Sequence, residues 1–275
     1  MFLFSFLIKN VIDPPLTSIE SVMTKNVVAA RSNTPVTEVI SLMVKFNVGT
    51  IPIVDSTTIP VGIITDGDVV REAALGKGIS PLVNTGDIIS ASYITMSPET
   101  AVKDAAREML SKRARILVTN RKSGALEGIV TTTDLLRVFS NILEDKPLTK
   151  FFTSNVKTLD VHASLKDAIE LMFTKKLGSV ILTTDGMPSA IVTERGLLGI
   201  LNKNRNLNSI TLDEVATKPL ITAAFGVTVK EATSIMLEKG IKRLPLMKGE
   251  KLVGITTALD LVSAFLSKVE IRVTR

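Results

Sequence analysis

One pattern occurs four times along this chain of 275 residues, and no other feature constrains the fold as much. Amphipathic helices are predicted to begin at Val36, Val102, Leu165 and Val229, where apolar residues recur at the i, i+3 or i+4 and i+7 spacing of one helix face. These starts lie 66, 63 and 64 residues apart. Such a nearly fixed period indicates tandem copies of one supersecondary unit, which bury their apolar faces against one another.

A β-rich segment surrounds each predicted helix. Two apolar runs joined by a polar turn follow the helix, as in a hairpin, and a shorter run precedes it. The expected strands include 26–30, 50–54 and 61–64 in the first copy, 92–95 in the second, and 244–247 and 252–256 in the last. Each copy is therefore predicted to be a β-α-β-β-α unit, which places the chain in the α/β class.

The linkers between the copies are rich in Gly, Pro, Asn and charged residues. The copies are predicted at 17–76, 85–143, 150–202 and 211–267, after an apolar extension at 1–16 that is expected to pack on the body. A single copy of about 60 residues leaves much of its sheet exposed. We therefore expect sheet-to-sheet pairs, the first copy with the second and the third with the fourth.

A short signature ends the third strand of each copy and begins the second helix. It contains the pairs Thr65 and Asp68, Thr131 and Asp134, and Thr257 and Asp260, whereas the third copy has Thr193 with Gly196 in place of the acid. One interpretation is a capping box, which satisfies amides of the first helical turn. The other is a ligand site, because a helix start offers N–H groups to a phosphate and the carboxylate can accept both hydroxyls of a ribose. Recurrence in phase favours the ligand site.

The β-α-β-β-α unit with G-h-h-T-x-x-D at its third strand (h, an apolar residue) resembles the CBS domain, named after cystathionine β-synthase. The resemblance covers nearly all of residues 17–267 in four copies, an arrangement similar to the γ subunit of AMP-activated protein kinase. It implies that the copies pair into two modules, that the modules form a disc, and that the clefts hold an adenine nucleotide. AMP, ADP and ATP are the expected ligands, ahead of S-adenosylmethionine, and no metal is required.

In this family each cleft combines the Thr and Asp of one copy with residues of its partner that flank the adenine. The resemblance implies that Thr131 and Asp134 face Val28 and Val48, that Thr65 and Asp68 face Ile94 and Ala114, and that Thr257 and Asp260 face Lys157 and Leu177. Three basic residues, Arg115, Lys242 and Arg243, match family positions that reach phosphates at the centre of the disc. The alternative for these three is a solvated surface location.

The cleft with Gly196 departs from the pattern. Loss of a charge-assisted hydrogen bond to the ribose costs about 1.5–3 kcal/mol, or roughly 10- to 150-fold in affinity. We therefore expect this cleft to be weak or empty.

The composition excludes several kinds of chemistry. The sequence has no cysteine and one histidine, His162, which excludes disulfides, thiolate metal sites and a His-based zinc site within the chain. No spacing suggests an acid–base pair or an activated nucleophile, so no enzyme function is expected. The net charge of +6 permits contact with phosphates.

Two hypotheses remain. The leading one is a non-catalytic adenine-nucleotide sensor that transmits ligand occupancy to a separate regulated protein. The alternative is a basic architectural protein that binds DNA or RNA through phosphates, although Tyr93 is the only tyrosine and tryptophan is absent, so little base stacking is available. The apolar N-terminal run is shorter than the about 20 residues of a membrane span. We expect a cytoplasmic protein that forms the disc as one chain or as a homodimer.

Overall fold

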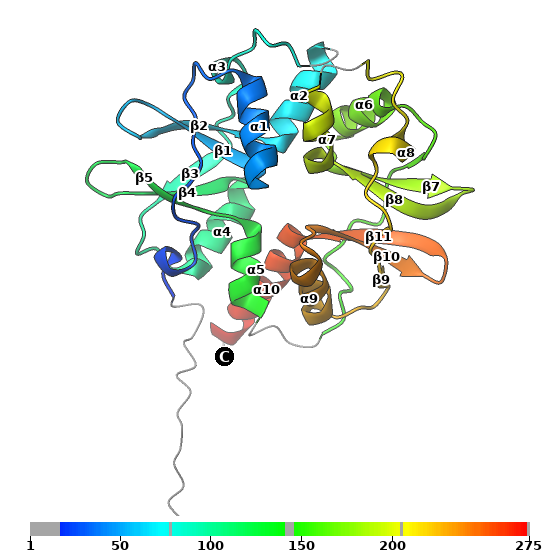
Figure 1. Cartoon of the computed structure of the whole chain (residues 1–275). Coiled ribbons are helices and arrows are strands. Elements are labelled where there is room, and N and C mark those ends of the chain that lie inside the picture. Colours follow the sequence, from blue (N-terminus) through cyan, green and yellow to red (C-terminus); the bar gives the residue numbers. More distant parts are fainter. Residues whose placement is uncertain (1–16, 77–78, 141–145, 204–205, 274–275) are drawn as a thin grey trace, which may run out of the picture.

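The computed structural model describes residues 17–76, 79–140, 146–203 and 206–273. The extension at 1–16, predicted to pack on the body, lies outside the described residues. Four repeats surround a common centre (Figure 1). The hairpins of repeats 1 and 2 lie side by side, as do those of repeats 3 and 4, while the helices of repeats 1 and 3 meet on one side and those of repeats 2 and 4 on the other.

Each repeat contains a first helix, a hairpin and a second helix, and a leading strand precedes them in repeats 2, 3 and 4, which confirms the predicted unit except for the first strand of repeat 1. Repeat 1 has α1 (Val36–Phe46), β1 (Thr50–Val54), β2 (Pro60–Thr65) and α2 (Asp66–Gly76). Repeat 2 has β3 (Tyr93–Met96), α4 (Val102–Lys112), β4 (Arg115–Thr119), β5 (Leu126–Val130) and α5 (Thr132–Ser140). Repeat 3 has β6 (Thr158–Asp160), α6 (Leu165–Lys175), β7 (Ser179–Thr184), β8 (Met187–Thr193) and α7 (Glu194–Leu201). Repeat 4 has β9 (Ala223–Ala224), α9 (Val229–Lys239), β10 (Arg243–Lys248), β11 (Lys251–Thr257) and α10 (Ala258–Val273).

Short helical turns precede three repeats: η2 (Ile19–Ser21), α3 (Thr85–Ile88) and α8 (Leu212–Val215). The first helix of each repeat begins where the apolar periodicity predicts. Each ends at a residue in the left-handed conformation, namely Asn47, Arg113, Lys176 and Gly240. Such an ending turns the chain sharply out of the helix, here into the hairpin.

The strand predicted at 26–30 does not form, and only Ala30 makes an isolated parallel bridge, to Ile53. In this register the next hydrogen bond of the ladder would need an N–H group on Pro52, which proline lacks. Pro245 occupies the same hairpin position in repeat 4, where β9 is only two residues long. Repeats 2 and 3 have no proline there, and their leading strands β3 and β6 are longer.

The two main hydrophobic cores join repeats across the predicted pairs. One core unites repeats 1 and 3, and the other unites repeats 2 and 4. The second helix of each repeat begins with two adjacent apolar residues, such as Val69–Val70 and Leu197–Leu198, which are all nearly inaccessible to solvent. Adjacent residues point about 100° apart around a helix, so each pair serves two surfaces, its own sheet and the helices of the opposite repeat.

Candidate functional site

Three strand-to-helix corners share one arrangement. In each, Oδ2 of the aspartate accepts hydrogen bonds from the backbone N–H and the hydroxyl of the threonine three residues earlier. The distances are 2.8 and 2.7 Å at Asp68, 2.9 and 2.7 Å at Asp134, and 2.8 and 2.6 Å at Asp260. The aspartates therefore act locally as caps. Each carboxylate keeps a second oxygen, Oδ1, for another partner.

That second oxygen differs in its surroundings among the corners. Arg71 Nη2 lies 2.5 Å from Oδ1 of Asp68, and Arg137 Nη1 lies 3.3 Å from Oδ1 of Asp134. The two arginine side chains are 50% and 68% exposed, so water screens their side of these ion pairs, whereas the two aspartate side chains are only 8% exposed. Repeat 4 has no arginine at this position. In the described part of the chain, Oδ1 of Asp260 has no protein donor.

The corner of repeat 3 has lost both charged groups. Gly196 replaces the aspartate, and Gly199 stands where repeats 1 and 2 have arginine. Thr193 still caps α7, since its Oγ1 accepts from the Gly196 N–H at 3.1 Å. A Cβ atom on Gly196 would meet only Thr193 Oγ1, at 3.4 Å, and one on Gly199 would meet nothing within 4 Å. The missing side chains therefore leave open space.

The leading segments, meaning the residues just before the first helix of each repeat, cross the third strand of the partner repeat. Thr24 and Ile129 exchange two backbone hydrogen bonds of 2.9 and 3.1 Å. Equivalent antiparallel bridges join Ser90 to Ile63, Thr153 to Ile255, and Thr217 to Ile191. The predicted pairing of repeat 1 with 2 and of repeat 3 with 4 is thus confirmed. Each crossing brings a leading segment beside the partner's corner.

Side-chain size is matched at these crossings. A Cβ atom would lie 2.2 Å from Ile89 if added at Gly62, 2.4 Å from Met23 at Gly128, and 2.5 Å from Phe152 at Gly254. In repeat 3 the signature begins with Ala190 instead, and the residue that occupies the equivalent place on the leading segment is Ala216. The signature glycine is therefore explained by packing of the partner's leading segment.

The residues predicted to flank the adenine lie on the leading segments and at the starts of the hairpins. Val28 and Val48 are half-buried against the core of repeats 1 and 3. Ile94 packs against the core of repeats 2 and 4, and Ala114 is buried. Lys157 Nζ donates to Asn155 Oδ1 at 3.2 Å. Their contact with a ligand and with the opposite corners stays a prediction.

A central charge cluster draws on all four repeats: Asp66, Asp68, Arg115, Glu194, Arg195, Lys242 and Arg243. Arg195 reaches from repeat 3 into repeat 1, where its Nε lies 3.5 Å from Asp66 Oδ2. Arg243 Nη2 lies 3.6 Å from Glu194 Oε2. The three basic residues singled out from the sequence thus lie near one another and near Asp68, which was also predicted. Arg195, Asp66 and Glu194 complete the cluster and were not indicated by the sequence.

Burial and crowding shift two pKa values in this cluster. Burial, followed by the charge of Asp66, raises the pKa of Glu194 to about 7, against the opposing effect of Arg243 and Arg115. Burial, followed by Arg195, lowers the pKa of Lys242. Part of the Lys242 side chain is exposed, so water screens that effect.

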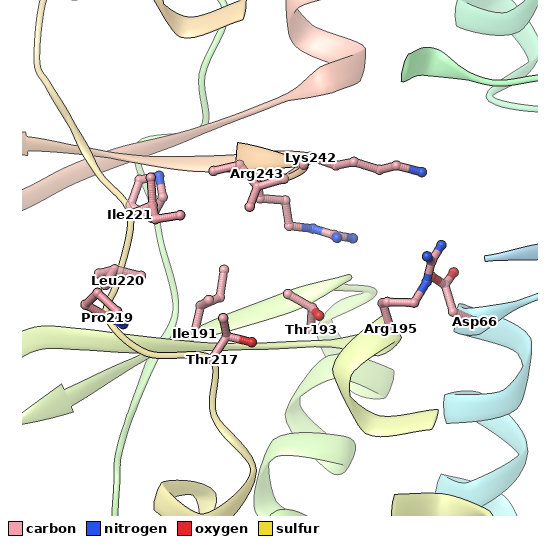
Figure 2. Close-up of a pocket in the computed structure, with 13 residues that line it drawn as sticks. Asp66, Ile191, Thr193, Arg195, Thr217, Pro219, Leu220, Ile221, Lys242 and Arg243 are labelled. Atoms are coloured by element: carbon pink, nitrogen blue, oxygen red, sulfur yellow. The ribbon is translucent and has the colours of Figure 1, made fainter. Parts of the chain in front are cut away.

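The repeat 3–4 cleft is a pocket of about 180 Å³ at the crossing of β8 by the leading segment of repeat 4. Apolar side chains form its walls, and basic side chains form one end (Figure 2). The walls include Ile191, Leu220, Ile221 and Ile241, and the end includes Arg195, Lys242 and Arg243. In Figure 2, Lys242 and Arg243 extend toward the region where Arg195 meets Asp66. Of the predicted site residues, Lys242 and Arg243 lie here together with Thr193.

A second pocket, the repeat 1–3 cleft, has a volume of about 440 Å³ and lies between α2 and the C-terminal end of α6. It is lined by Thr65, Asp68 and Arg71 from repeat 1 and by Phe173, Lys176 and Leu177 from repeat 3, among others. Leu177 therefore lies beside the corner of repeat 1 in this structure, and its predicted contact with the corner of repeat 4 remains untested. Pattern reasoning within single repeats could not find a pocket that two modules create together.

Other chemistry is not indicated by the described residues. They contain no group of three or more His, Asp or Glu side chains that could hold a metal ion. His162 is exposed, and its backbone N–H donates to Asp160 Oδ1 at 2.9 Å. None of the described helices has the length and apolar character needed to cross a membrane.

Four copies of one α/β unit, paired into two modules with clefts between the repeats, define a class of tandem-repeat α/β proteins. The CBS domain matches residues 19–75, 86–141, 148–203 and 212–267, so the chain belongs to the CBS domain family.

Two related chains come from one archaeon. Protein MJ1225 of Methanocaldococcus jannaschii is 27% identical over 187 residues, 62% of this chain and 66% of that protein. Protein MJ1404 of the same organism is 26% identical over 274 residues, 89% of this chain and 61% of that protein. The chain thus spans less than two thirds of the length of these relatives.

Solved structures show the same fold. The crystal structure of MJ1225 superposes with a TM-score of 0.81 at 19% identity, over 90% of this chain and 100% of that one. A conserved protein from Pyrococcus horikoshii gives a TM-score of 0.62 at 22% identity, over 90% of this chain and 100% of that one.

Proposed function

We propose that this chain is a non-catalytic adenine-nucleotide sensor whose ligand occupancy is transmitted to a separate regulated protein. The observation that carries the proposal is the repeat 3–4 cleft, in which apolar walls from two repeats lead to the basic end formed by Arg195, Lys242 and Arg243. An apolar cavity of about 150 Å³ can bind benzene, so a pocket of about 180 Å³ has room for a planar aromatic ring. A base would occupy the apolar part, and the phosphate would meet the basic end.

The acidic corners supply the second element of recognition. Each carboxylate is oriented by two hydrogen bonds from its threonine, which leaves Oδ1 as an acceptor for ribose hydroxyls. Asp260 offers this oxygen without competition from an arginine. On this basis the corner of Asp260 can bind a ribose without losing another partner. At Asp68 and Asp134 the ribose hydroxyls would replace the ion pair with the neighbouring arginine.

Transmission follows from the position of the central charge cluster. Phosphates that enter it compete with Asp66 for Arg195, a contact between the two modules, and with Glu194 for Arg243, a contact between repeats 3 and 4 of one module. A ligand that binds one arrangement of the modules better than another shifts the population that a partner protein encounters. The related protein MJ1225 has been put forward as an archaeal homolog of g-AMPK.

The nucleic-acid alternative has no specific observation in its favour. The basic residues Arg115, Lys242 and Arg243 interact with one another and with acids in the central cluster, rather than forming an extended stripe along one face. Salt-dependent binding of a DNA duplex with the clefts saturated by nucleotide would revive this alternative.

Isothermal titration calorimetry with AMP, ADP, ATP and S-adenosylmethionine tests the proposal. We expect at least one adenine nucleotide to bind with a Kd well below 1 mM and with more than one site per chain. Asp260→Asn should weaken one site about tenfold or more, because the amide keeps the cap but loses the charge. Asp167→Asn, in the exposed capping box of α6, is the matched control and should leave binding unchanged. Absence of binding below about 1 mM for all four compounds rules the function out.

A further inference from the structure

The repeat 3–4 cleft differs in chemistry from the three acidic corners. We infer that this cleft binds an adenine nucleotide through its base and phosphate alone, without recognition of the ribose hydroxyls, so that it accepts deoxyribonucleotides as readily as ribonucleotides. The inference rests on the proposed function and adds a second ligand specificity to it. The specificity-determining residue is Gly196.

The first observation is the lack of an available acceptor for a sugar hydroxyl. Among the residues that the structure describes, Asp66 is the one carboxylate that lines this cleft, and Arg195 already pairs with it at 3.5 Å. At the other corners a buried or half-buried aspartate stands where Gly196 stands here. A nucleotide in this cleft therefore gains no charge-assisted hydrogen bond from its diol, and removal of the diol costs nothing at that position.

The second observation concerns the threonine hydroxyl. At the three acidic corners the hydroxyl proton is directed to the aspartate, at 2.6 to 2.7 Å. Thr193 Oγ1 accepts from the Gly196 N–H, and within the described part of the chain its own proton has no acceptor. Because Thr193 lines the cleft, its hydroxyl is a free donor there. A free donor can bind a phosphate oxygen or a ring nitrogen of the base, so it does not depend on the presence of the ribose hydroxyls.

The third observation is the supply of binding free energy that is independent of the sugar. Lys242 and Arg243 both line the cleft, and the guanidinium of Arg243 offers two parallel donors to a phosphate. The apolar walls bury the faces of a base. We expected a weak or empty cleft because the contact with the ribose is lost. The structure adds basic side chains for the phosphate and apolar walls for the base, which both favour binding.

The lost acid can be restored, which makes the inference testable by gain of selectivity. A Cβ atom at Gly196 meets only Thr193 Oγ1, at an ordinary contact distance of 3.4 Å, and the backbone there is not left-handed. Gly196→Asp should therefore rebuild the Thr–x–x–Asp corner of the other repeats. Gly199→Ala adds a side chain one turn further into open space and serves as the control.

The experiment uses a reporter specific to this cleft. The native chain has no tryptophan, so Leu220→Trp places a single indole in the wall of the cleft. AMP and 2′,3′-dideoxy-AMP are titrated into this protein and into its Gly196→Asp and Gly199→Ala derivatives. We expect the two nucleotides to bind the parent and the Gly199→Ala form within about threefold of each other, and Gly196→Asp to favour AMP by about tenfold or more. Calorimetric stoichiometry of the native chain with each nucleotide checks the result without the reporter.

The outcomes separate the two proposals. A native cleft that prefers AMP over the dideoxy nucleotide by tenfold or more overturns the inference while leaving the proposed function intact. A cleft that stays empty while the acidic corners bind AMP also overturns the inference, and the proposed function then rests on the acidic corners alone. If AMP binds to none of the clefts, the proposed function itself fails.

Discussion

The guanidinium of Arg195 donates to both the backbone carbonyl and the side-chain carbonyl of Asn47, with Nη1 at 2.9 Å from O and 3.2 Å from Oδ1. These residues are 148 positions apart and belong to different modules. Asn47 is the left-handed residue that ends α1, so its carbonyl is free of the helix and available to the arginine. The contact fastens the corner of repeat 3 to the start of the hairpin of repeat 1.

Substitution of Arg195 should weaken the joint between the modules. We predict that Arg195→Ala lowers the free energy of unfolding by about 1–3 kcal/mol, because two hydrogen bonds and the partner of Asp66 are lost. Arg195→Lys should recover only part of the lost stability, since a lysine ammonium cannot reproduce the planar arrangement of donors of the guanidinium. Urea denaturation measures the effect. Lys112→Ala, which removes an exposed pair with Glu108, is the control and should change stability by less than about 1 kcal/mol.

Two glycines make room for arginines at the centre, and alanine at either one should be destabilising. A Cβ atom at Gly49 would lie 1.9 Å from Arg195 Nη2, and one at Gly178 would lie 1.7 Å from Arg243 Nη2. We predict that each alanine variant displaces its arginine and loses about 1–3 kcal/mol of stability. Gly199→Ala should instead be neutral or stabilising by up to about 1 kcal/mol, because it removes a helical glycine where space is open. Equal effects of all three substitutions in thermal unfolding would contradict this.

The size match at the crossings predicts a rescue. Gly62→Ala should destabilise the protein by about 1–3 kcal/mol, because its Cβ overlaps Ile89. Combined with Ile89→Ala, it recreates the Ala190–Ala216 pair of repeats 3 and 4. In a double-mutant cycle by urea denaturation, we expect the double variant to lose at least about 1 kcal/mol less than the sum of the single losses. Simple additivity would mean that the two side chains do not meet.

Stability should fall with rising pH because of Glu194. Its pKa is raised from 4.5 to about 7 in the folded protein, so the folded state holds more protons than the unfolded state between these values. The loss of folding stability caused by ionisation of Glu194 is absent below about pH 4.5 and grows between pH 4.5 and 7. It is complete above about pH 7, where it amounts to roughly 3 kcal/mol. Glu194→Gln should flatten that part of the pH profile and be more stable than the native chain at pH 8. Parallel profiles for the two proteins would refute the role of this residue.

Much of the fold could be predicted because local patterns specify it. The starts of the four first helices, the hairpins and the pairing of the repeats follow from apolar periodicity and from the surface that one repeat leaves uncovered. The prediction of a strand at 26–30 was wrong, because the β-propensity of one segment does not show that a proline in the neighbouring strand removes a backbone hydrogen-bond donor. Each second helix begins with two adjacent apolar residues, and the second of them, such as Val70, could have predicted the hydrophobic cores that join repeats of different modules.

The site was only partly accessible from the sequence. The Thr–x–x–Asp corners could be located, but their geometry shows that each aspartate also caps its helix. The second carboxylate oxygen pairs with an arginine at Asp68 and Asp134, and at Asp260 it has no donor among the described residues. For this reason Asp134→Ala should lower both stability and binding, whereas an asparagine separates the two. The roles of Arg195, Asp66 and Glu194 arise from contacts between repeats that are far apart in sequence, which no motif within one repeat encodes.

The most direct test of the account is a crystal structure with saturating AMP. We predict nucleotide density in the clefts, with the ribose hydroxyls within hydrogen-bond distance of Oδ1 of Asp260 and the phosphate at the central charge cluster. Clefts without nucleotide, with Asp260 bound only to Thr257 and to its own helix, would contradict the central claim and leave the corners as helix caps alone.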